Sequence, residues 1–276
     1  MPAKIEITGL NKTYHSKTGD NITALQDVNL EIENEEFITL VGPSGCGKST
    51  LLKLIAALSK PSSGEIRLNG NLHTEPSRDI GIVFQDAVLL PWRTVLENVL
   101  LPLEILGLKK QHYRDRAFDL LRLVGLEGFE HRTPRELSGG MQHRAAICRA
   151  LVYDPSILVM DEPFASLDAM TREELGLEIM RIWEEHKKTV VFVTHSITEA
   201  ILLADRVVVM TPRPGRIADV INIELARPRS IDVEFTNKFK EYSDEVRSYI
   251  YRRRQDGSES SIAQGITSRS TYSMAK

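Results

Sequence analysis

The stretch Gly42-Pro43-Ser44-Gly45-Cys46-Gly47-Lys48-Ser49 is the most informative part of the sequence, because it joins a short apolar run to a helical one. Residues 36–41 before it are rich in strand formers, and residues 50–56 after it have the pattern of a helix. In the order strand, glycine-rich loop and helix, G-x-x-x-x-G-K-[ST] predicts a phosphate-binding loop. The alternative, a glycine-rich turn that only tightens packing, leaves the match at all eight positions unexplained. The stretch therefore predicts that the chain binds a nucleoside triphosphate.

The chemistry of this loop follows from its backbone and from two side chains. Its glycines let successive N–H groups turn inward around an anion, and the N-terminus of the helix adds partial positive charge. The Lys48 ammonium can reach the β- and γ-phosphates, and the Ser49 hydroxyl can ligate Mg²⁺. We expect every residue from Gly42 to Thr50 to take part in binding the nucleotide.

Composition indicates a cytoplasmic globular protein. A length of 276 residues suits one substantial domain with an extension. The net charge of −3 gives no indication of a nucleic-acid partner. The two cysteines, Cys46 and Cys148, do not suggest a disulfide framework, which fits a reducing compartment. No apolar run reaches the roughly 18 residues that a membrane span needs, and the first residues resemble no signal peptide. Any association with a membrane is therefore expected to come through a partner.

The pattern along the chain predicts an α/β fold with an inserted helical part. Most of residues 1–85 have the pattern of strands, the first of which alternate like those of a half-exposed antiparallel sheet. Apolar residues recur at helical spacing from about residue 94 to residue 149. Strand-like runs, two of them separated by a helix over 169–187, then return at residues 157–160, 189–194 and 206–210. Apolar strands that alternate with helices predict a parallel sheet covered on both faces.

The character of the chain changes again after Pro228. Apolar residues there fall at helical spacing and predict one stripe that packs back on the domain: Phe235, Phe239, Tyr242, Val246 and Tyr249. Residues 256–276 are rich in Ser, Thr and Gly, which predicts a disordered tail. We expect one domain over residues 1–226, with a helical subdomain at about 88–155, and a helical extension over 227–255.

Asp161 and Glu162 follow the apolar run at 157–160 and form a second candidate site. Carboxylates at the C-terminal end of a buried parallel strand lie at the edge of the sheet where ligands bind. Asp161 can there hold Mg²⁺, directly or through water, and Glu162 can polarise the water that attacks the γ-phosphate. Adjacent acids are common on protein surfaces, but this position in a chain with a phosphate loop favours function.

Leu137-Ser138-Gly139-Gly140-Met141-Gln142 is a third candidate site. Ser-Gly-Gly before a helix can be an ordinary cap, in which Ser138 accepts hydrogen bonds from backbone donors. It is also a second anion-binding helix N-terminus in a chain that already has one. Two phosphate-binding motifs with only one lysine-bearing loop suggest that two copies of the chain share each nucleotide.

Together these motifs resemble the nucleotide-binding subunit of an ABC transporter. They occur in that family's order, namely the phosphate loop, Gln85, Leu137 to Met141, Asp161-Glu162, Ser166-Leu167-Asp168 and His195. The resemblance covers about residues 3–225, and the combination is highly specific. It implies an α/β fold with a P-loop NTPase core, an antiparallel β subdomain and an inserted α-helical subdomain. It also implies hydrolysis of ATP with Mg²⁺ as the cofactor.

The resemblance assigns roles to residues that carry little weight alone. Tyr14 matches the aromatic residue that stacks on adenine, although a single Tyr in a strand is more often a packing residue. Gln85 matches the glutamine that touches Mg²⁺ and joins the core to the helical subdomain. Ser138 to Gly140 would contact the γ-phosphate held by the opposite subunit, and Asp168 would lie across the dimer interface. His195 would hydrogen-bond the γ-phosphate and hold the geometry of attack.

Four further stretches are similar to importers of the nitrate/sulfonate/taurine type, at residues 84–93, 182–183, 194–200 and 212–217. Pro91-Trp92-Arg93 follows the glutamine loop, where the family receives a coupling helix from the membrane subunit. Trp and Arg are also frequent in the energetic centres of interfaces, but a Trp buried inside the helical subdomain is the alternative. The resemblance implies membrane permease subunits as partners, contacted around Gln85, Pro91, Trp92 and Arg93, and indirectly an extracytoplasmic solute-binding protein.

The implied mechanism is that of an ATPase subunit that drives transport but forms no channel itself. ATP on Lys48 of one subunit would be closed in by Ser138 to Gly140 of the other, and hydrolysis with Glu162 would reopen the pair. Such a subunit lies peripherally on the cytoplasmic face of the inner membrane and energises uptake of a small, anionic solute. The rival is a soluble ABC-type ATPase, for example in iron–sulfur assembly. The identity of the solute and of the second cassette, the same chain or a related one, stays open.

Overall fold

The structure is a computed structural model that describes residues 4–15, 20–165 and 167–263. Its centre is a six-stranded sheet with the strand order β10-β9-β3-β8-β7-β6. These strands are β3 (Phe37–Val41), β6 (Ile80–Val83), β7 (Ile157–Asp161), β8 (Thr189–Val193), β9 (Arg206–Met210) and β10 (Ile217–Asn222). All neighbouring pairs are parallel except β9 with β10, so the predicted parallel sheet is present with one antiparallel edge strand.

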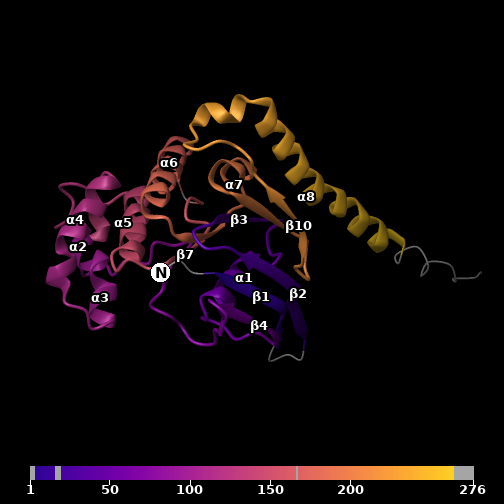
Figure 1. Cartoon of the computed structure of the whole chain (residues 1–276), viewed down its shortest axis with the longest axis horizontal. Coiled ribbons are helices and arrows are strands. Elements are labelled where there is room, and N and C mark those ends of the chain that lie inside the picture. The colour runs from indigo at the N-terminus through magenta and orange to yellow at the C-terminus, as the bar shows by residue number, and fades with distance from the viewer. Residues whose placement is uncertain (1–3, 16–19, 166, 264–276) are drawn as a thin grey trace, which may run out of the picture.

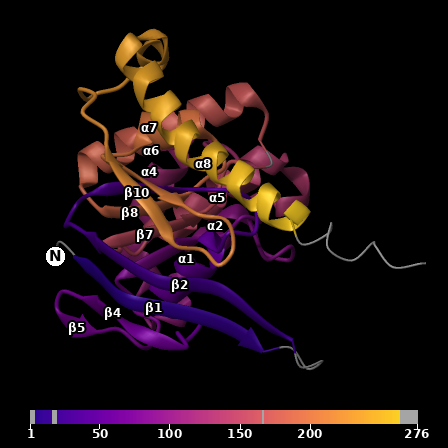
Figure 2. The same ribbon diagram turned by 90° about the vertical axis from the view of Figure 1, so that its right-hand side faces the viewer.

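A second, antiparallel sheet lies beside the first, with the order β2-β1-β4-β5. It consists of β1 (Ile5–His15), β2 (Asn21–Ile32), β4 (Ser63–Leu68) and β5 (Asn71–Leu72). Helix α1 (Lys48–Ile55) packs with apolar residues of both sheets in one hydrophobic cluster. The helix that follows the phosphate loop is therefore held between the two sheets (Figure 2).

The inserted helices group at one side of the molecule (Figure 1). They are α2 (Val95–Val99), α3 (Leu101–Ile105), α4 (Arg114–Leu123) and α5 (Gly139–Leu151). The first begins at a capping box, in which the Thr94 hydroxyl accepts from the Glu97 N–H and the Glu97 carboxylate accepts from the Thr94 N–H. No helix in the described part of the chain is long and apolar enough to span a bilayer.

The parallel sheet separates two hydrophobic clusters. On β8, Val190 and Phe192 belong to the cluster that includes the inserted helices, and Val191 and Val193 belong to the cluster around α1. Helices α6 (Ala169–His186) and α7 (Ile197–Leu203) pack in the first of these clusters. Because successive residues of a strand point to opposite faces, this assignment places helices on both faces of the sheet.

The C-terminal extension consists of the 3₁₀ turn η3 (Ile231–Phe235) and the helix α8 (Asn237–Ala263). Phe239 and Val246 are buried, and Tyr242 and Tyr249 pack against the same cluster. Phe235 was wrongly placed in this stripe: it is 76% exposed, because the extended backbone at residue 236 separates it from the helical phase of α8. The helix also continues past residue 255, where the extension was expected to end, and residues 264–276 lie outside the described residues.

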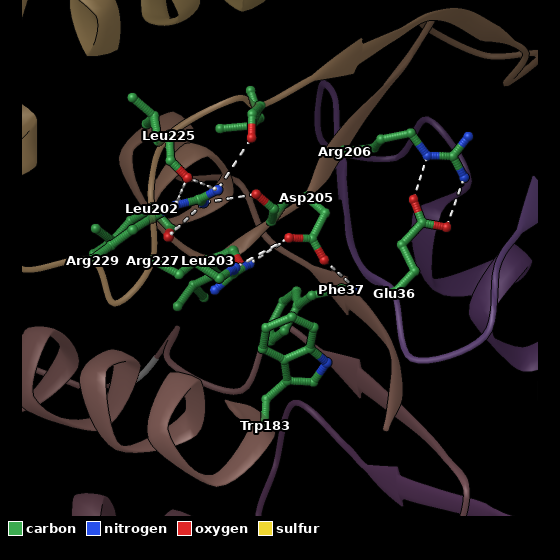
Figure 3. A network of polar contacts seen from close by, with 12 residues as sticks. Glu36, Phe37, Trp183, Leu202, Leu203, Asp205, Arg206, Leu225, Arg227 and Arg229 are labelled. Atoms are coloured by element: carbon green, nitrogen blue, oxygen red, sulfur yellow. Dashed lines mark hydrogen bonds and ion pairs between the residues drawn. The ribbon is translucent and has the colours of Figure 1, made fainter. Parts of the chain in front are cut away.

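The extension is fixed to the domain by two arginines (Figure 3). The Arg227 guanidinium donates to Asp205 and lies 4.3 Å from the centre of the Trp183 ring. Arg229 is buried and donates to backbone carbonyls at the end of α7 and in the segment after β10. These contacts hold the start of the extension against the end of α7 and the segment that follows β10.

Candidate nucleotide site

The glycine-rich loop between β3 and α1 has a backbone that only glycine can adopt. Gly47 has φ 111°, and a Cβ atom there would lie 2.7 Å from Leu25 Cδ2 and 2.9 Å from the carbonyl oxygen of Ala24. A larger residue would therefore be strained and would also clash with β2. Cys46 is buried in the cluster around α1, where its side chain packs as a small apolar group, and burial raises the pKa of its thiol.

Lys48 lies across the inside of this loop. Its ammonium donates to the carbonyl oxygens of Gly42 at 2.9 Å and of Pro43 at 3.3 Å, and the residue is 5% exposed. A buried cation held by neutral carbonyls is incompletely compensated. An anion in the loop would supply the missing negative charge, as the motif predicts.

Ser49 and Asp161, which are 112 positions apart in the sequence, are joined directly. The Ser49 hydroxyl donates to Asp161 Oδ1 at 2.9 Å. Burial raises the pKa of the Asp161 carboxyl, and the hydrogen bond from Ser49 partly opposes this. A divalent cation would favour the carboxylate form. A hydroxyl and a carboxylate are oxygen ligands of the kind that Mg²⁺ takes together with phosphate oxygens, so the donor set fits the predicted ion.

A cleft of about 510 Å³ lies over the loop and is bounded by residues from both sheets. Its lining comprises Tyr14, Ile22, Ala24, Ser44, Gly45, Gly47, Lys48, Ser49, Thr50, Gln85, Glu162 and Arg213. Tyr14 is 42% exposed, so it is not the core packing residue that a lone Tyr in a strand often is. The structure thus brings the predicted adenine residue, the phosphate loop and Glu162 of one chain to a single cleft of a size common for ligand sites.

Glu162 and His195 meet at the C-terminal edge of the parallel sheet. Glu162 follows β7, His195 follows β8, and His195 Nδ1 lies 3.3 Å from Glu162 Oε2. The Glu162 N–H donates to the carbonyl of Val193 at 3.0 Å, which fixes its backbone at the unusual φ of 46°. Such strain in a non-glycine residue is found mainly where a side chain must be aimed. Glu162 also lines the cleft.

Gln85 reaches the cleft from the loop that follows β6, and helix α5 fixes this loop. His143 Nε2 contacts the Gln85 carbonyl at 2.8 Å. Arg149 donates to the carbonyls of Ala87 and Val88 at 2.8 and 2.7 Å. The glutamine loop and the helix that starts at Ser138 are therefore tied together by side chains. No local pattern indicates these contacts, because they join residues about 60 positions apart.

The third motif does not line the cleft of its own chain. Ser138 caps α5 by accepting from the Met141 N–H at 3.3 Å, and a Cβ on Gly139 would meet nothing within 4 Å. Asp168 caps α6 by accepting from the Thr171 N–H at 3.0 Å, a contact that lowers the pKa of its carboxyl. The two motifs are neighbours, since a Cβ on Gly140 would lie 3.3 Å from Thr171 Cγ2. Ser166 is outside the described residues.

Arg213 lines the cleft but was not among the predicted site residues. Its Nη2 and Nε atoms donate to the carbonyl of Gly45 at 3.1 and 3.2 Å. It sits on a turn that is locked to the loop, because a Cβ on Gly215 would lie 2.0 Å from the carbonyl oxygen of Cys46. The sequence signal was the turn Pro212-Arg213-Pro214-Gly215-Arg216, which does not reveal what the arginine packs against.

Comparison with known proteins agrees with this geometry. The family model described as ABC transporter matches residues 25–165. The chain is 50% identical to the uncharacterized ABC transporter ATP-binding protein MJ0412 of Methanocaldococcus jannaschii, over 85% of this chain and 88% of that protein. It is 43% identical to the aliphatic sulfonates import ATP-binding protein SsuB of Bacillus cereus, over 92% of this chain and 96% of that protein.

A solved structure confirms the predicted fold class. The ATP-binding cassette MJ0796, in a dimeric post-hydrolysis state bound to ADP and Pi, matches with a TM-score of 0.71 at 35% identity. The match covers 80% of this chain and 100% of the cassette. The motifs, the cleft and these similarities agree, and the chain belongs to the ABC transporter family as one of its ATP-hydrolysing ATP-binding cassettes.

Proposed function

We propose that this cassette energises the import of a small, anionic solute of the sulfonate, taurine or nitrate kind through separate membrane subunits. The observation that carries the proposal is the cleft in which the phosphate loop, Gln85 and Glu162 face one another. The importer type is supported by the 43% identity to SsuB over almost the whole of both chains. It is also supported by the importer-like residues 84–93 and 212–217.

The loop and its neighbours would bind MgATP in this cleft. Backbone N–H groups of the loop and the Lys48 ammonium would hold the phosphates, and Tyr14 would stack on the base. Ser49, Asp161 and Gln85 would hold Mg²⁺, which when bound neutralises charge on the phosphate oxygens. The direct contact between Ser49 and Asp161 supports this assignment, because it places two of the three ligands together before any ion binds.

Glu162 would act as the general base for the attacking water. It lines the cleft, and the hydrogen bond from its N–H to the Val193 carbonyl fixes its backbone there. His195, 3.3 Å from that carboxylate, would donate to the γ-phosphate and keep Glu162 in place. Correct placement of water, base and phosphate is the main contribution that a protein makes to phosphoryl transfer.

A second cassette, either the same chain or a related one, would complete each site. Ser138 to Gly140 and Asp168 do not line the cleft of their own chain, and a Cβ atom on Gly139 would meet nothing within 4 Å, which leaves room for a partner at the start of α5. The dimeric form of the cassette MJ0796 supports this arrangement. Two nucleotides would then be held between the phosphate loop of one copy and the α5 N-terminus of the other.

The membrane subunits would dock on an apolar groove beside the glutamine loop. The groove of about 390 Å³ is lined by Phe84, Val88 and Ile105 among others. Trp92 is 74% exposed and Ile105 is 77% exposed, which excludes a buried core role for Trp92. Exposed apolar residues of this size mark interaction sites. Docking there would place the cassette peripherally on the cytoplasmic face of the membrane, with a solute-binding protein acting on the other side.

Solute uptake tests the proposed function directly. Cells that lack this chain are expected to lose uptake of at least one of labelled taurine, a labelled alkanesulfonate or labelled nitrate, and to regain it with the wild-type chain. The Lys48→Ala variant, which cannot bind phosphate normally, should not restore it. Unchanged uptake of all three solutes in the deletion strain would reject this importer type, and failure to co-purify with a membrane protein would favour the soluble ATPase.

Trp92→Ala is expected to separate hydrolysis from transport. Trp92 makes no part of the cleft, so the basal ATPase rate of the isolated cassette should stay within about twofold of wild type. Loss of a large aromatic contact should cost the docking interface about 2 kcal/mol or more and abolish most solute uptake. The measurement is ATPase activity in solution beside uptake in cells. Loss of nucleotide binding in this variant would instead show that Trp92 acts on the nucleotide site and not at the docking surface.

Arg213→Ala is expected to weaken MgATP binding about tenfold. Its guanidinium lines the cleft and uses two N–H groups on Gly45, which leaves other donors for the nucleotide and lends a positive charge. Arg216→Ala is the matched control, because Arg216 lies on the same turn but donates to Gln26 outside the cleft. Fluorescent-nucleotide titration measures both. Equal affinity in the two variants would remove Arg213 from the site.

A further inference from the structure

We propose that Arg172 and Glu199 form a positioning bridge that ties the loop ending at Asp168 to the loop that carries His195. Through this bridge, contact with a second copy at Asp168 would set the position of His195 in the first. The inference deepens the proposed function and rests on it, because it takes His195 to act at the γ-phosphate and Asp168 to face the second copy.

The first end of the bridge is Arg172, in the first turn of α6. Its Nη2 donates to the carbonyl of Leu167 at 3.1 Å, so the guanidinium holds the backbone immediately before Asp168. Its Nε is buried, makes no hydrogen bond within the described residues and lies 3.5 Å from Glu199 Oε1. The Glu199 carboxylate is therefore the charge partner of this arginine.

The other end of the bridge is Glu199, on α7. Its side chain is 14% exposed, and burial raises the pKa of its carboxyl, so the charged form depends on partners. Its second oxygen, Oε2, accepts from the Thr194 hydroxyl at 2.5 Å. That hydroxyl in turn accepts from the Ser196 N–H at 3.0 Å. One carboxylate thus holds Arg172 with one oxygen and a hydroxyl of the histidine loop with the other.

The position of Thr194 connects this contact to the chemistry. Thr194 and Ser196 flank His195, and the hydrogen bond between them encloses it in a short turn. His195 Nδ1 lies 3.3 Å from Glu162 Oε2. A displacement at Leu167 and Asp168 would therefore be carried by Arg172 and Glu199 to the turn that aims His195. Because imprecise placement of reacting groups costs rate, this path can make hydrolysis depend on the second copy.

The charges around Glu199 favour this pairing. Arg172 and His195 both favour the carboxylate form of Glu199, while Glu162 opposes it. A cavity of about 250 Å³ between α6, α7 and η3 places Glu173 and Glu234 nearby as well. Because these neighbours are acidic, they cannot compensate the negative charge of Glu199. The guanidinium of Arg172 supplies the positive charge beside it.

The test is the ATPase kinetics of the purified full chain. Arg172→Met keeps the length of the side chain without its charge, and Glu199→Gln keeps the shape without the carboxylate. We expect each to lower kcat by about 10- to 100-fold, to leave the Kd for MgATP within about twofold and to bring the Hill coefficient for ATP to about 1. The double variant should be no worse than either single one, because both break the same link.

The matched control is Arg181→Met, which breaks an exposed pair with Glu185 on the same helix. It should leave kcat and the Hill coefficient unchanged. Wild-type kinetics in both Arg172→Met and Glu199→Gln would overturn the bridge. A parallel loss of MgATP affinity, melting temperature and kcat in both variants would also overturn it, because such a pattern indicates a purely structural role. If the wild-type chain itself hydrolysed no ATP, the proposed function would fail. If the wild type is active and both variants have the same kinetics as the wild type, only the bridge is rejected.

Discussion

Glu162→Gln is expected to lower ATP turnover by about 10²- to 10⁴-fold, the range that general acid–base catalysis contributes. Glutamine has nearly the same shape as glutamate but cannot take the proton of the attacking water. The loop and Ser49 are untouched by the change, so the Kd for MgATP should stay close to the wild-type value. ATP that binds but does not react should hold two cassettes together, because the γ-phosphate would bridge them.

Steady-state phosphate release and gel filtration with MgATP measure these two effects. Glu185→Gln is the control, because Glu185 is an exposed residue of α6 that pairs with Arg181 on the same helix. It should hydrolyse ATP at the wild-type rate. Turnover near wild type in Glu162→Gln would mean that another group is the base. An ATP-loaded variant that stays monomeric would contradict the sharing of each nucleotide between two copies.

The central strands could be predicted because they are buried on both faces. The apolar run at residues 206–210 coincides with β9, and the run at 157–160 falls one residue short of β7. A strand in the middle of a parallel sheet must be apolar at nearly every position, so its ends are visible where the apolar run ends. Sequence alone is sufficient where burial is that complete.

Half-exposed and short elements were predicted less well. The alternating pattern at the start of the chain predicted strands but not their bounds, since β2 runs from Asn21 to Ile32 with exposed and buried residues mixed along it. Helix α7 and strand β10 were not predicted. Seven residues of helix have little apolar periodicity, and β10 forms an edge that depends on antiparallel pairing with β9. Such elements are stabilised by tertiary contacts, which leave weak local signals.

The same difference separates the predicted site residues from those that were missed. The phosphate loop is a local motif, and Glu162 is placed by the strand before it, so their chemistry is encoded within a few residues. Arg213 reaches Gly45 across 168 positions, and Arg172 meets Glu199 through the packing of two helices. Contacts of this kind depend on how elements pack, which no single stretch of sequence specifies.

Arg229→Met is expected to lower the free energy of unfolding by about 2–4 kcal/mol, the largest stability effect that we anticipate. The Arg229 Nη1 atom donates to the carbonyls of Ile201, Leu202 and Ala204 at 2.9, 3.0 and 2.7 Å, and Figure 3 labels Leu202 among them. Its Nη2 atom donates to the carbonyls of Ile223 and Leu225, both at 3.2 Å. Burial lowers the pKa of Arg229 to about 10, so the guanidinium is still charged at neutral pH.

Methionine would preserve the apolar stem of Arg229 but leave these carbonyls without their donor, and unmade hydrogen bonds of buried groups are the costly kind. Lysine in its place has fewer N–H donors, all on one nitrogen atom. It should therefore recover less than half of the lost free energy of unfolding. The control is Arg247→Met, which removes an exposed pair with Asp244 on α8 and should change stability by less than about 0.5 kcal/mol. Urea unfolding followed by circular dichroism measures all three variants. If Arg229→Met were as stable as Arg247→Met, water must replace the lost donors, and Arg229 would not be what fastens the C-terminal extension to the domain.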